Sequence, residues 1–185
     1  LGIELKVSPL RFLPRANLYT TKERNVLKMV DYTEIAENDR WEHTNIKKKL
    51  NRILFVLYVH DKEIEAWEWK VCKVFLWSPS KLEKQKIQTD YELMRSKVLS
   101  GQNLREGDHK FFATCPKHGG GYLKDSPLES PRSALAIHPI MKFAEKRGYC
   151  IKREAFIEII ADSINAPLEK VGRTIGIHGD YLTLI

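Results

Sequence analysis

The sequence contains little cysteine: Cys72, Cys115 and Cys150 are the three in 185 residues. The number is odd, and no two of them have Cys-x-x-Cys spacing. This pattern argues against both a disulfide framework and a zinc ribbon. We therefore expect a protein of a reducing compartment, with a cytoplasmic location.

Long hydrophobic runs are also missing. The longest, Ile53–Val59, is much shorter than the roughly 20 residues that a membrane-spanning helix needs, so no span is predicted. No signal peptide is predicted, and the chain starts at Leu1 inside a strand-like stretch. We expect sequence upstream of Leu1 in the natural protein.

Several enzyme motifs are absent. The glycine-rich stretch after Cys115 lacks the Gly-x-x-x-x-Gly-Lys spacing of a P-loop, and no Ser-His-Asp or Cys-His arrangement is visible. The six histidines are scattered without the spacing of zinc ligands. The common nucleotide-binding, serine- or cysteine-hydrolase and zinc signatures are thus not found.

Acidic residues are fewer than basic ones. The chain has 24 Asp and Glu against 31 Lys and Arg, a formal net charge of +7 and a pI near 9.3. Such an excess favours a polyanionic partner, because Lys and Arg that neutralise phosphates release condensed counterions. The alternative is that the charge serves only solubility.

The hydrophobic pattern predicts strands and helices that do not strictly alternate. Strands are expected at 2–7, 53–59, 67–74 and 110–114, and helices at 20–30, 78–99 and 153–163. Residues 116–131 have the composition of a loop, 141–146 fit either state, and the chain from 164 onward lacks a clear pattern. This order predicts an α/β domain with a mixed β-sheet flanked by helices.

Glu4 and Lys6 lie two residues apart on the first predicted strand. Both side chains would therefore emerge on one face, while Ile3 and Leu5 point into the core. A carboxylate is a hard ligand for magnesium, and a neighbouring ammonium can orient water and stabilise charge on a phosphate. The same pair is common on ordinary exposed strands, so it indicates a nuclease only with further support.

Two other segments have the chemistry of nucleic-acid binding. Lys47, Lys48, Lys49 and Arg52 precede the most apolar strand and would stand at the edge of the sheet, although a solvated helix end fits equally well. The segment 115–121 contains three consecutive glycines, which could bring the backbone close to DNA in a groove.

In their order, these segments resemble the MutH mismatch-repair endonuclease and related GATC-cutting restriction enzymes. The resemblance covers roughly residues 2–162 and rests on five stretches: Gly2–Lys6, Trp41–Leu54, Leu76–Pro79, Cys115–Lys117 and Arg147–Tyr149. It implies a restriction-endonuclease-like fold of the PD-(D/E)xK type. The nuclease domain would span 1–163, with 164–185 as a linker or the start of a following segment.

The resemblance also implies roles for individual residues. Glu4, Lys6 and Lys49 would be catalytic, and Glu4 and Leu5 would hold Mg²⁺. The family's Asp would lie about seven residues before Glu4, upstream of Leu1. The residues implied in DNA binding are Lys47, Lys48, Arg52, Cys115, Pro116, Lys117, His118 and Tyr149.

Within this group, Pro116 and Lys117 correspond to the reader of the GATC base edges, a role that suits a lysine facing guanine acceptors. Tyr149 lies one position before the tyrosine that MutH links to adenine-methylation sensing. Leu18–Leu27 resembles the restriction-enzyme branch more than MutH.

The implied function is magnesium-dependent hydrolysis of double-stranded DNA at a GATC-like site, leaving 5′-phosphates, by a protein that dimerises on DNA or pairs with a second domain of the same chain. One alternative is a mismatch-repair nickase that needs a partner ATPase. The other is a cleavage-incompetent DNA-binding or effector domain, against which the retention of Glu4, Lys6 and Lys49 argues.

Overall fold

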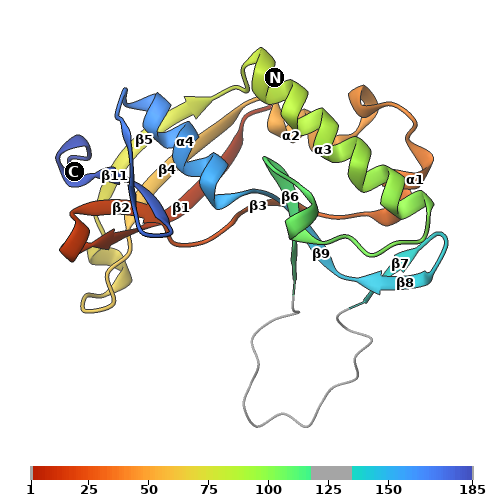
Figure 1. Ribbon diagram of the computed structural model, residues 1–185, viewed down its shortest axis with the longest axis horizontal. Helices are drawn as coiled ribbons and strands as arrows, with labels where there is room; N and C mark the ends of the chain where they lie inside the picture. The colour runs from red at the N-terminus through yellow and green to blue at the C-terminus, as the bar shows by residue number, and fades with distance from the viewer. Residues whose placement is uncertain (1, 118–134, 185) are drawn as a thin grey trace, which may run out of the picture. The chain divides into compact units, whose positions relative to one another are not determined.

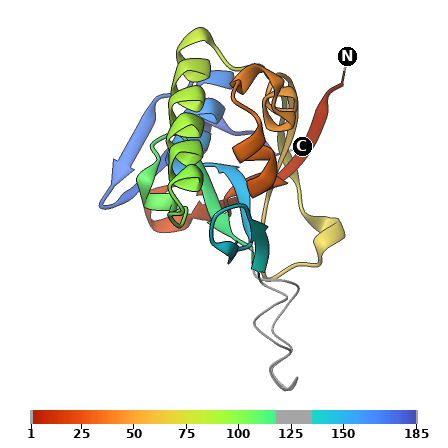
Figure 2. The same cartoon turned by 90° about the vertical axis from the view of Figure 1, so that its right-hand side faces the viewer.

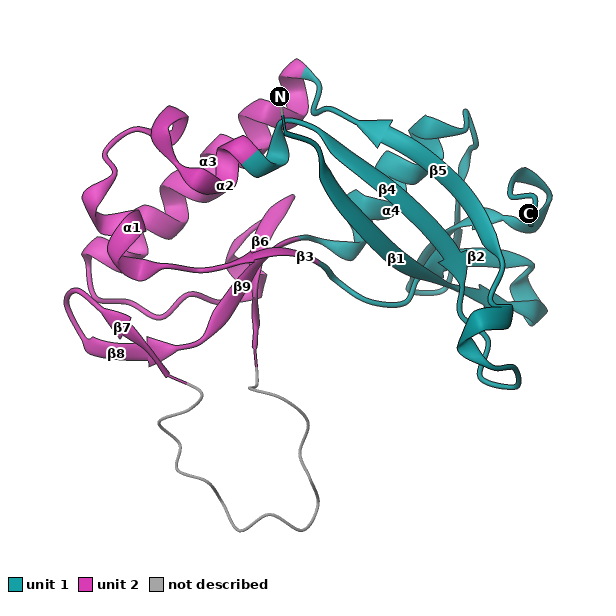
Figure 3. Ribbon diagram, turned by 180° about the vertical axis from the view of Figure 1, so that it is seen from behind, with its two compact units in different colours: residues 1–25, 49–80, 151–185 teal, residues 26–48, 81–150 magenta. Residues whose placement is uncertain are grey.

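The computed structural model describes residues 2–117 and 135–184 (Figure 1). It forms two compact units whose segments alternate along the chain (Figure 3). Unit 1 comprises residues 1–25, 49–80 and 151–185, and unit 2 comprises 26–48 and 81–150. Within the described residues, no helix has both the length and the apolar character to cross a membrane.

The helices and strands succeed one another along the chain as follows: β1 (Glu4–Leu13), β2 (Leu18–Thr21), β3 (Asn25–Met29), α1 (Tyr32–Glu37), α2 (Asn45–Leu50), β4 (Ile53–Val59), β5 (Val71–Trp77), α3 (Lys81–Leu99), β6 (Phe112–Pro116), β7 (Leu135–His138), β8 (Lys142–Glu145), β9 (Arg147–Ile151), α4 (Arg153–Ser163), β10 (Leu168–Val171) and β11 (Thr174–His178).

Unit 1 is built on a six-stranded sheet in the order β10-β11-β2-β1-β4-β5 (Figure 1). β1 and β4 are parallel, and the other neighbours are antiparallel. Helix α4 packs against β2, β5 and β11, with the ring of Phe156 4.8 Å from that of Phe55. The predicted α/β class with a mixed sheet is therefore confirmed.

Unit 2 contains the three-stranded sheet β3-β9-β6, the hairpin β7-β8 and helices α1 and α3. Figure 2 shows α3 as one continuous helix beside α1. Asp90 on α3 is buried, and its carboxylate accepts hydrogen bonds from the backbone N–H groups of Lys110, Phe111 and Phe112. This carboxylate thus fixes the start of β6 to the helix.

Three predicted elements are confirmed closely. The apolar run forms β4 at Ile53–Val59, α4 spans Arg153–Ser163, and the long helix ends at Leu99. On α3, Ile87, Tyr91, Met94 and Val98 are buried, whereas Leu82 and Leu93 are exposed.

The prediction of a helix at 20–30 is wrong, because this segment forms β2 and β3. The Thr20–Glu23 segment has capping-box spacing, but the chain there belongs to β2 and the turn after it, with Leu10 of β1 opposite Thr21. β3 then alternates buried and partly buried residues with a period of two, which is the periodicity of a strand. Ser8 and Pro9, which follow the strand predicted at 2–7, also belong to β1, because its pairing with β4 continues to Leu10.

Two strand positions also differ from expectation. The strand predicted at 67–74 begins at Val71, because Ala66–Glu68 forms a 3₁₀ turn. Residues 168–178, where the sequence has no clear pattern, form the hairpin β10-β11. Ile177 of β11 pairs with Tyr19 of β2, which joins this hairpin to the sheet of unit 1.

Candidate active site

Strand pairing determines the position of Glu4. It is the first residue of β1, and its N–H donates to the carbonyl of Arg52 at 3.0 Å. Because β1 and β4 are parallel, the start of β1 lies beside the start of β4, with Glu4 opposite Ile53. Helix α2 ends just before β4, so its last turn comes close to Glu4.

Three charged side chains of unit 1 meet there. The Lys49 Nζ donates to Glu4 Oε1 at 3.1 Å and to Oε2 at 3.0 Å, across 45 positions of sequence. The Lys6 Nζ lies 3.2 Å from Glu4 Oε1. The structure therefore brings together the three residues predicted to be catalytic.

The carboxyl group of Glu4 is held in its charged form. Its side chain is 22% exposed, and this burial alone would raise its pKa. The hydrogen bonds and positive charges of Lys49 and Lys6 outweigh that effect, so the pKa of Glu4 lies below its ordinary value. Glu4 is thus an anion at neutral pH, the form that binds a metal cation.

The two faces of β1 differ from the prediction. Glu4 and Lys6 share a face as expected, but Ile3 and Leu5 do not enter the core: they are 51% and 58% exposed. The covered face instead carries Glu4, Lys6, the buried Ser8 and the fully buried Leu10. The charged pair can lie on this side because Lys49 completes its ionic contacts.

The donor set for a metal is small. Both oxygens of Glu4 already accept from lysines, and the oxygen that Leu5 can offer is its backbone carbonyl. No group of three His, Cys, Asp or Glu side chains gathers anywhere in residues 2–117 and 135–184. Mg²⁺ is commonly held by one or two carboxylates plus waters and substrate phosphates, and Glu4 fits one such ligand.

The other predicted basic residues flank this centre in sequence. Lys47 and Lys48 precede Lys49 on α2, whose Ile46 and Leu50 are buried one helical turn apart. Lys48 is exposed, while Lys47 and Arg52 are partly exposed. Thr44 accepts from the N–H of Lys47 at 3.3 Å and so caps this short helix.

Unit 2 contains the remaining predicted residues. Pro116 ends β6 and is exposed, and Lys117 is partly exposed, its N–H donating to the Lys146 carbonyl at 2.8 Å. The side chains of Cys115 and Tyr149 lie inside the unit, at 4% and 2% exposure, rather than at its surface.

Each of these two buried residues packs within unit 2. Tyr149 stacks on Phe112 at 5.4 Å, and Cys115 packs with Ala113 and Cys150. Burial raises the pKa of Tyr149 well above its ordinary value, so the phenol stays neutral. These two residues support the strand ends that present Pro116 and Lys117. His118 lies outside the described residues.

Sequence reasoning missed the roles of Arg147 and Gly148, although both lie in a segment of the resemblance. Buried Arg147 donates from Nε to Thr114 Oγ1 at 2.9 Å and from Nη2 to the Thr114 carbonyl at 3.0 Å, and it pairs with Glu145. These bonds tie β9 to β6. A Cβ at Gly148 would lie 2.8 Å from Val26, so only glycine fits without a shift.

The region that contains the Glu4 centre is also similar to known proteins. The family model of the DNA mismatch repair enzyme MutH matches residues 1–90, a region that contains Glu4, Lys6 and Lys49. The chain is 28% identical over 169 residues to the type II restriction enzyme Sau3AI of Staphylococcus aureus, covering 87% of this chain and 34% of that protein.

The chain is also 33% identical over 104 residues to the DNA mismatch repair protein MutH of Salmonella paratyphi B, and equally to that of Salmonella newport, covering 55% of this chain and 42% of each protein. It thus spans between a third and a half of the length of these relatives. The predicted resemblance to MutH-type endonucleases and GATC-cutting restriction enzymes is thus confirmed.

Proposed function

We propose that this chain carries the nuclease centre of a site-specific DNA endonuclease with a restriction-endonuclease-like fold. The observation that carries the proposal is the contact of Lys49 and Lys6 with Glu4, inside the segment that the MutH family model matches. A carboxylate with two ammoniums is a set of groups suited to a metal cation and a phosphate together.

The proposed reaction is hydrolysis of a phosphodiester. The oxygen of a water molecule forms a bond to phosphorus, the bond from phosphorus to the 3′ oxygen breaks, and the products carry a 5′-phosphate and a 3′-hydroxyl. The attacking water gives its proton to solvent, and the leaving 3′ oxygen takes one up. Lys6 orients the attacking water, and Lys49 neutralises the phosphate.

Mg²⁺ is the proposed cofactor, with Glu4 and the Leu5 carbonyl as protein ligands. When bound, it would polarise the phosphate and favour the ionised form of the attacking water. The part of the chain itself is to hold Glu4 ionised, which the two lysines achieve.

Base reading is assigned to unit 2. Pro116 is the last residue of the strand that Asp90 and Arg147 hold in place, and Lys117 follows it, so the backbone that carries the Lys117 ammonium is anchored. We propose that this ammonium contacts guanine acceptors in the major groove of a GATC-like site. Two such centres, from dimerisation on DNA or from a second domain, would be needed to cut both strands. A cytoplasmic location belongs to the same proposal.

The similarity to Sau3AI reaches across 87% of the chain and the similarity to MutH across 55%, which favours restriction-type cleavage over repair-type nicking. A strand-nicking enzyme that requires a partner ATPase is the second candidate, because the family model is that of MutH.

The test is cleavage by the natural full-length protein. Supercoiled plasmid with GATC sites should be linearised in Mg²⁺ and left intact with a chelator, and the ends should accept ligation without prior phosphorylation. A plasmid without GATC is the control substrate. Nicking only after a partner ATPase is added would favour the repair branch. Binding without any cleavage would favour a DNA-binding or effector domain.

A further inference from the structure

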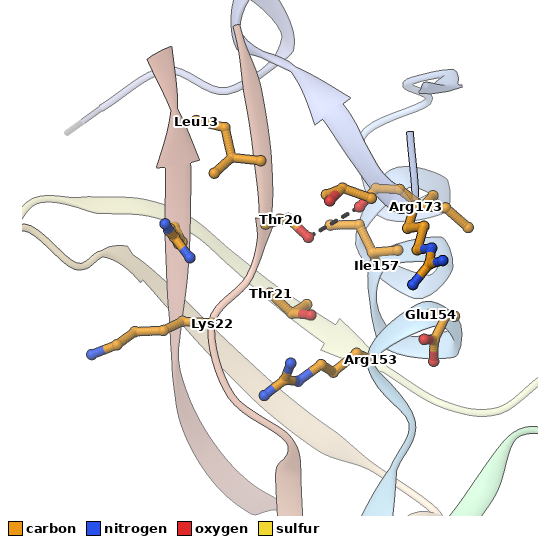
Figure 4. Close-up of a pocket in the computed structure, with 11 residues that line it drawn as sticks. Leu13, Thr20, Thr21, Lys22, Arg153, Glu154, Ile157 and Arg173 are labelled. Carbon is orange, nitrogen blue, oxygen red and sulfur yellow. Dashed lines mark hydrogen bonds between the residues drawn. The ribbon is translucent and has the colours of Figure 1, made fainter. Parts of the chain in front are cut away.

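Unit 1 has a polar cavity beside the end of β1 that is distant from Glu4. It has a volume of about 280 Å³ and is lined by residues of β1, β2, α4 and the β10-β11 hairpin (Figure 4). Arg11 is seven positions after Glu4 on the same strand, which separates the two by roughly 23 Å at the usual rise of a strand. The cavity is therefore distinct from the Glu4 centre.

Its charge is strongly positive. Four cations line it, Arg11, Lys22, Arg153 and Arg173, against one carboxylate, Glu154. The side chains of Arg11, Arg153 and Arg173 form no ion pair or hydrogen bond with any residue in 2–117 and 135–184. Three separate segments of the chain thus bring uncompensated guanidinium groups to one cavity.

The neutral groups of the cavity are also suited to an anion. Thr21 adds a hydroxyl beside Arg153, whereas Arg173 lies above Glu154 and Lys22 points to the other side (Figure 4). The Thr20 hydroxyl donates to the Ile175 carbonyl at 3.0 Å, which anchors the hairpin that carries Arg173. Guanidinium forks match the oxygens of phosphate in pairs.

We propose that the cleft formed by Arg11, Arg153, Arg173 and Thr21 binds a phosphate group. This inference rests on the proposed function in taking the backbone of duplex DNA as the source of that phosphate. A volume of 280 Å³ is at the small end of ligand pockets, so it suits one phosphate with part of its sugar rather than a whole dinucleotide. A solvated surface with no ligand is the alternative.

The test compares two charge-matched double variants of the natural full-length protein. Arg153→Gln with Arg173→Gln removes two cleft cations, both on exposed side chains. Lys62→Gln with Lys70→Gln removes two exposed cations of the β4–β5 connection and serves as the control. Affinity for a GATC duplex and a scrambled duplex is measured in Ca²⁺ across a salt series.

The cleft variant should bind both duplexes roughly tenfold more weakly and flatten the log–log salt slope by about one unit, the contribution of one phosphate. The control should lose much less. Equal losses in the two double variants, or no loss in either, would overturn DNA as the source.

A second arm identifies the source of the phosphate and does not depend on nuclease function. Inorganic phosphate should raise the Tm of the parent relative to chloride at equal ionic strength, and this rise should vanish in the cleft variant. Loss of the phosphate effect with unchanged duplex binding would assign the cleft to free phosphate. Parent and cleft variant behaving alike in both arms would overturn the cleft. If the parent binds no duplex, the proposed function fails, while the phosphate arm still reports on the cleft.

Discussion

The Glu4 centre of unit 1 and the Lys117 region of unit 2 are built from different interactions. Around Glu4, opposite charges meet on the covered face of a sheet, so the groups available for chemistry also hold one another in place. Around Lys117, a buried arginine, an aromatic stack and a glycine form the support. We infer that unit 1 carries the groups that cleave the phosphodiester and that unit 2 carries the groups that recognise the DNA sequence.

The largest effect is expected for Lys49→Ala. It should lower the cleavage rate about 10²–10³-fold, the size typical for loss of one group that stabilises charge in a transition state. Single-turnover cleavage of a GATC duplex measures this rate, and Lys62→Ala is the control, an exposed lysine of the same unit. A Lys49 variant as fast as the Lys62 variant would remove Lys49 from the chemistry.

Arg147→Met should destabilise unit 2 by about 3 kcal/mol, because Thr114 loses two charged donors and Glu145 its partner. Denaturant unfolding of this variant and of exposed Arg105→Met gives the comparison. We also expect cleavage of non-cognate sites to rise relative to cognate sites, since Lys117 would be less firmly placed. Unchanged stability would mean that Arg147 does not hold β6 to β9.

Lys117→Ala should reduce discrimination between a GATC duplex and a scrambled one by about 1–3 kcal/mol, the range for one base contact. Affinity for the scrambled duplex should hardly change. Both affinities are measured at one salt concentration. Equal weakening on the two duplexes would make Lys117 a phosphate contact and would break the proposed division between the units.

The smallest effect concerns pH. The pKa of Glu4 is depressed in the fold, so its ion pairs contribute stability above the unfolded pKa, and that contribution disappears as pH falls through the folded value. The contribution should be below about 1 kcal/mol because the group is partly exposed. NMR titration should show the Glu4 pKa rising in Lys49→Ala. An unchanged pKa would mean that the Lys49 contact does not persist in solution.

Local pattern was enough for some elements and insufficient for others. The strand Ile53–Val59 and the helix Arg153–Ser163 were predictable, because an apolar run and a helical hydrophobic period are visible within one short segment of sequence. The 20–30 segment was not, since pairing of Thr21 with Leu10 outweighs a local capping signal. The exposed face of β1 and the β10-β11 hairpin likewise depend on distant partners.

The candidate site shows the same limit. The residues alone indicated a Glu-x-Lys pair, and the family resemblance added Lys49, which the structure places on Glu4. Neither indicated the cleft, because Arg11, Arg153 and Arg173 come from segments that no motif links. Arg147 lay inside a recognised stretch, but its bonds to Thr114 become visible only once β6 and β9 are paired.

The central claim is that Glu4 is the carboxylate of a nuclease centre. Glu4→Gln in the natural full-length protein, assayed on supercoiled GATC plasmid in Mg²⁺, tests it most directly, with exposed Glu63→Gln as the matched control. We predict that Glu4→Gln leaves the plasmid uncut while still binding the duplex, and that Glu63→Gln cuts at the parental rate. Cleavage by Glu4→Gln at the parental rate would contradict the account.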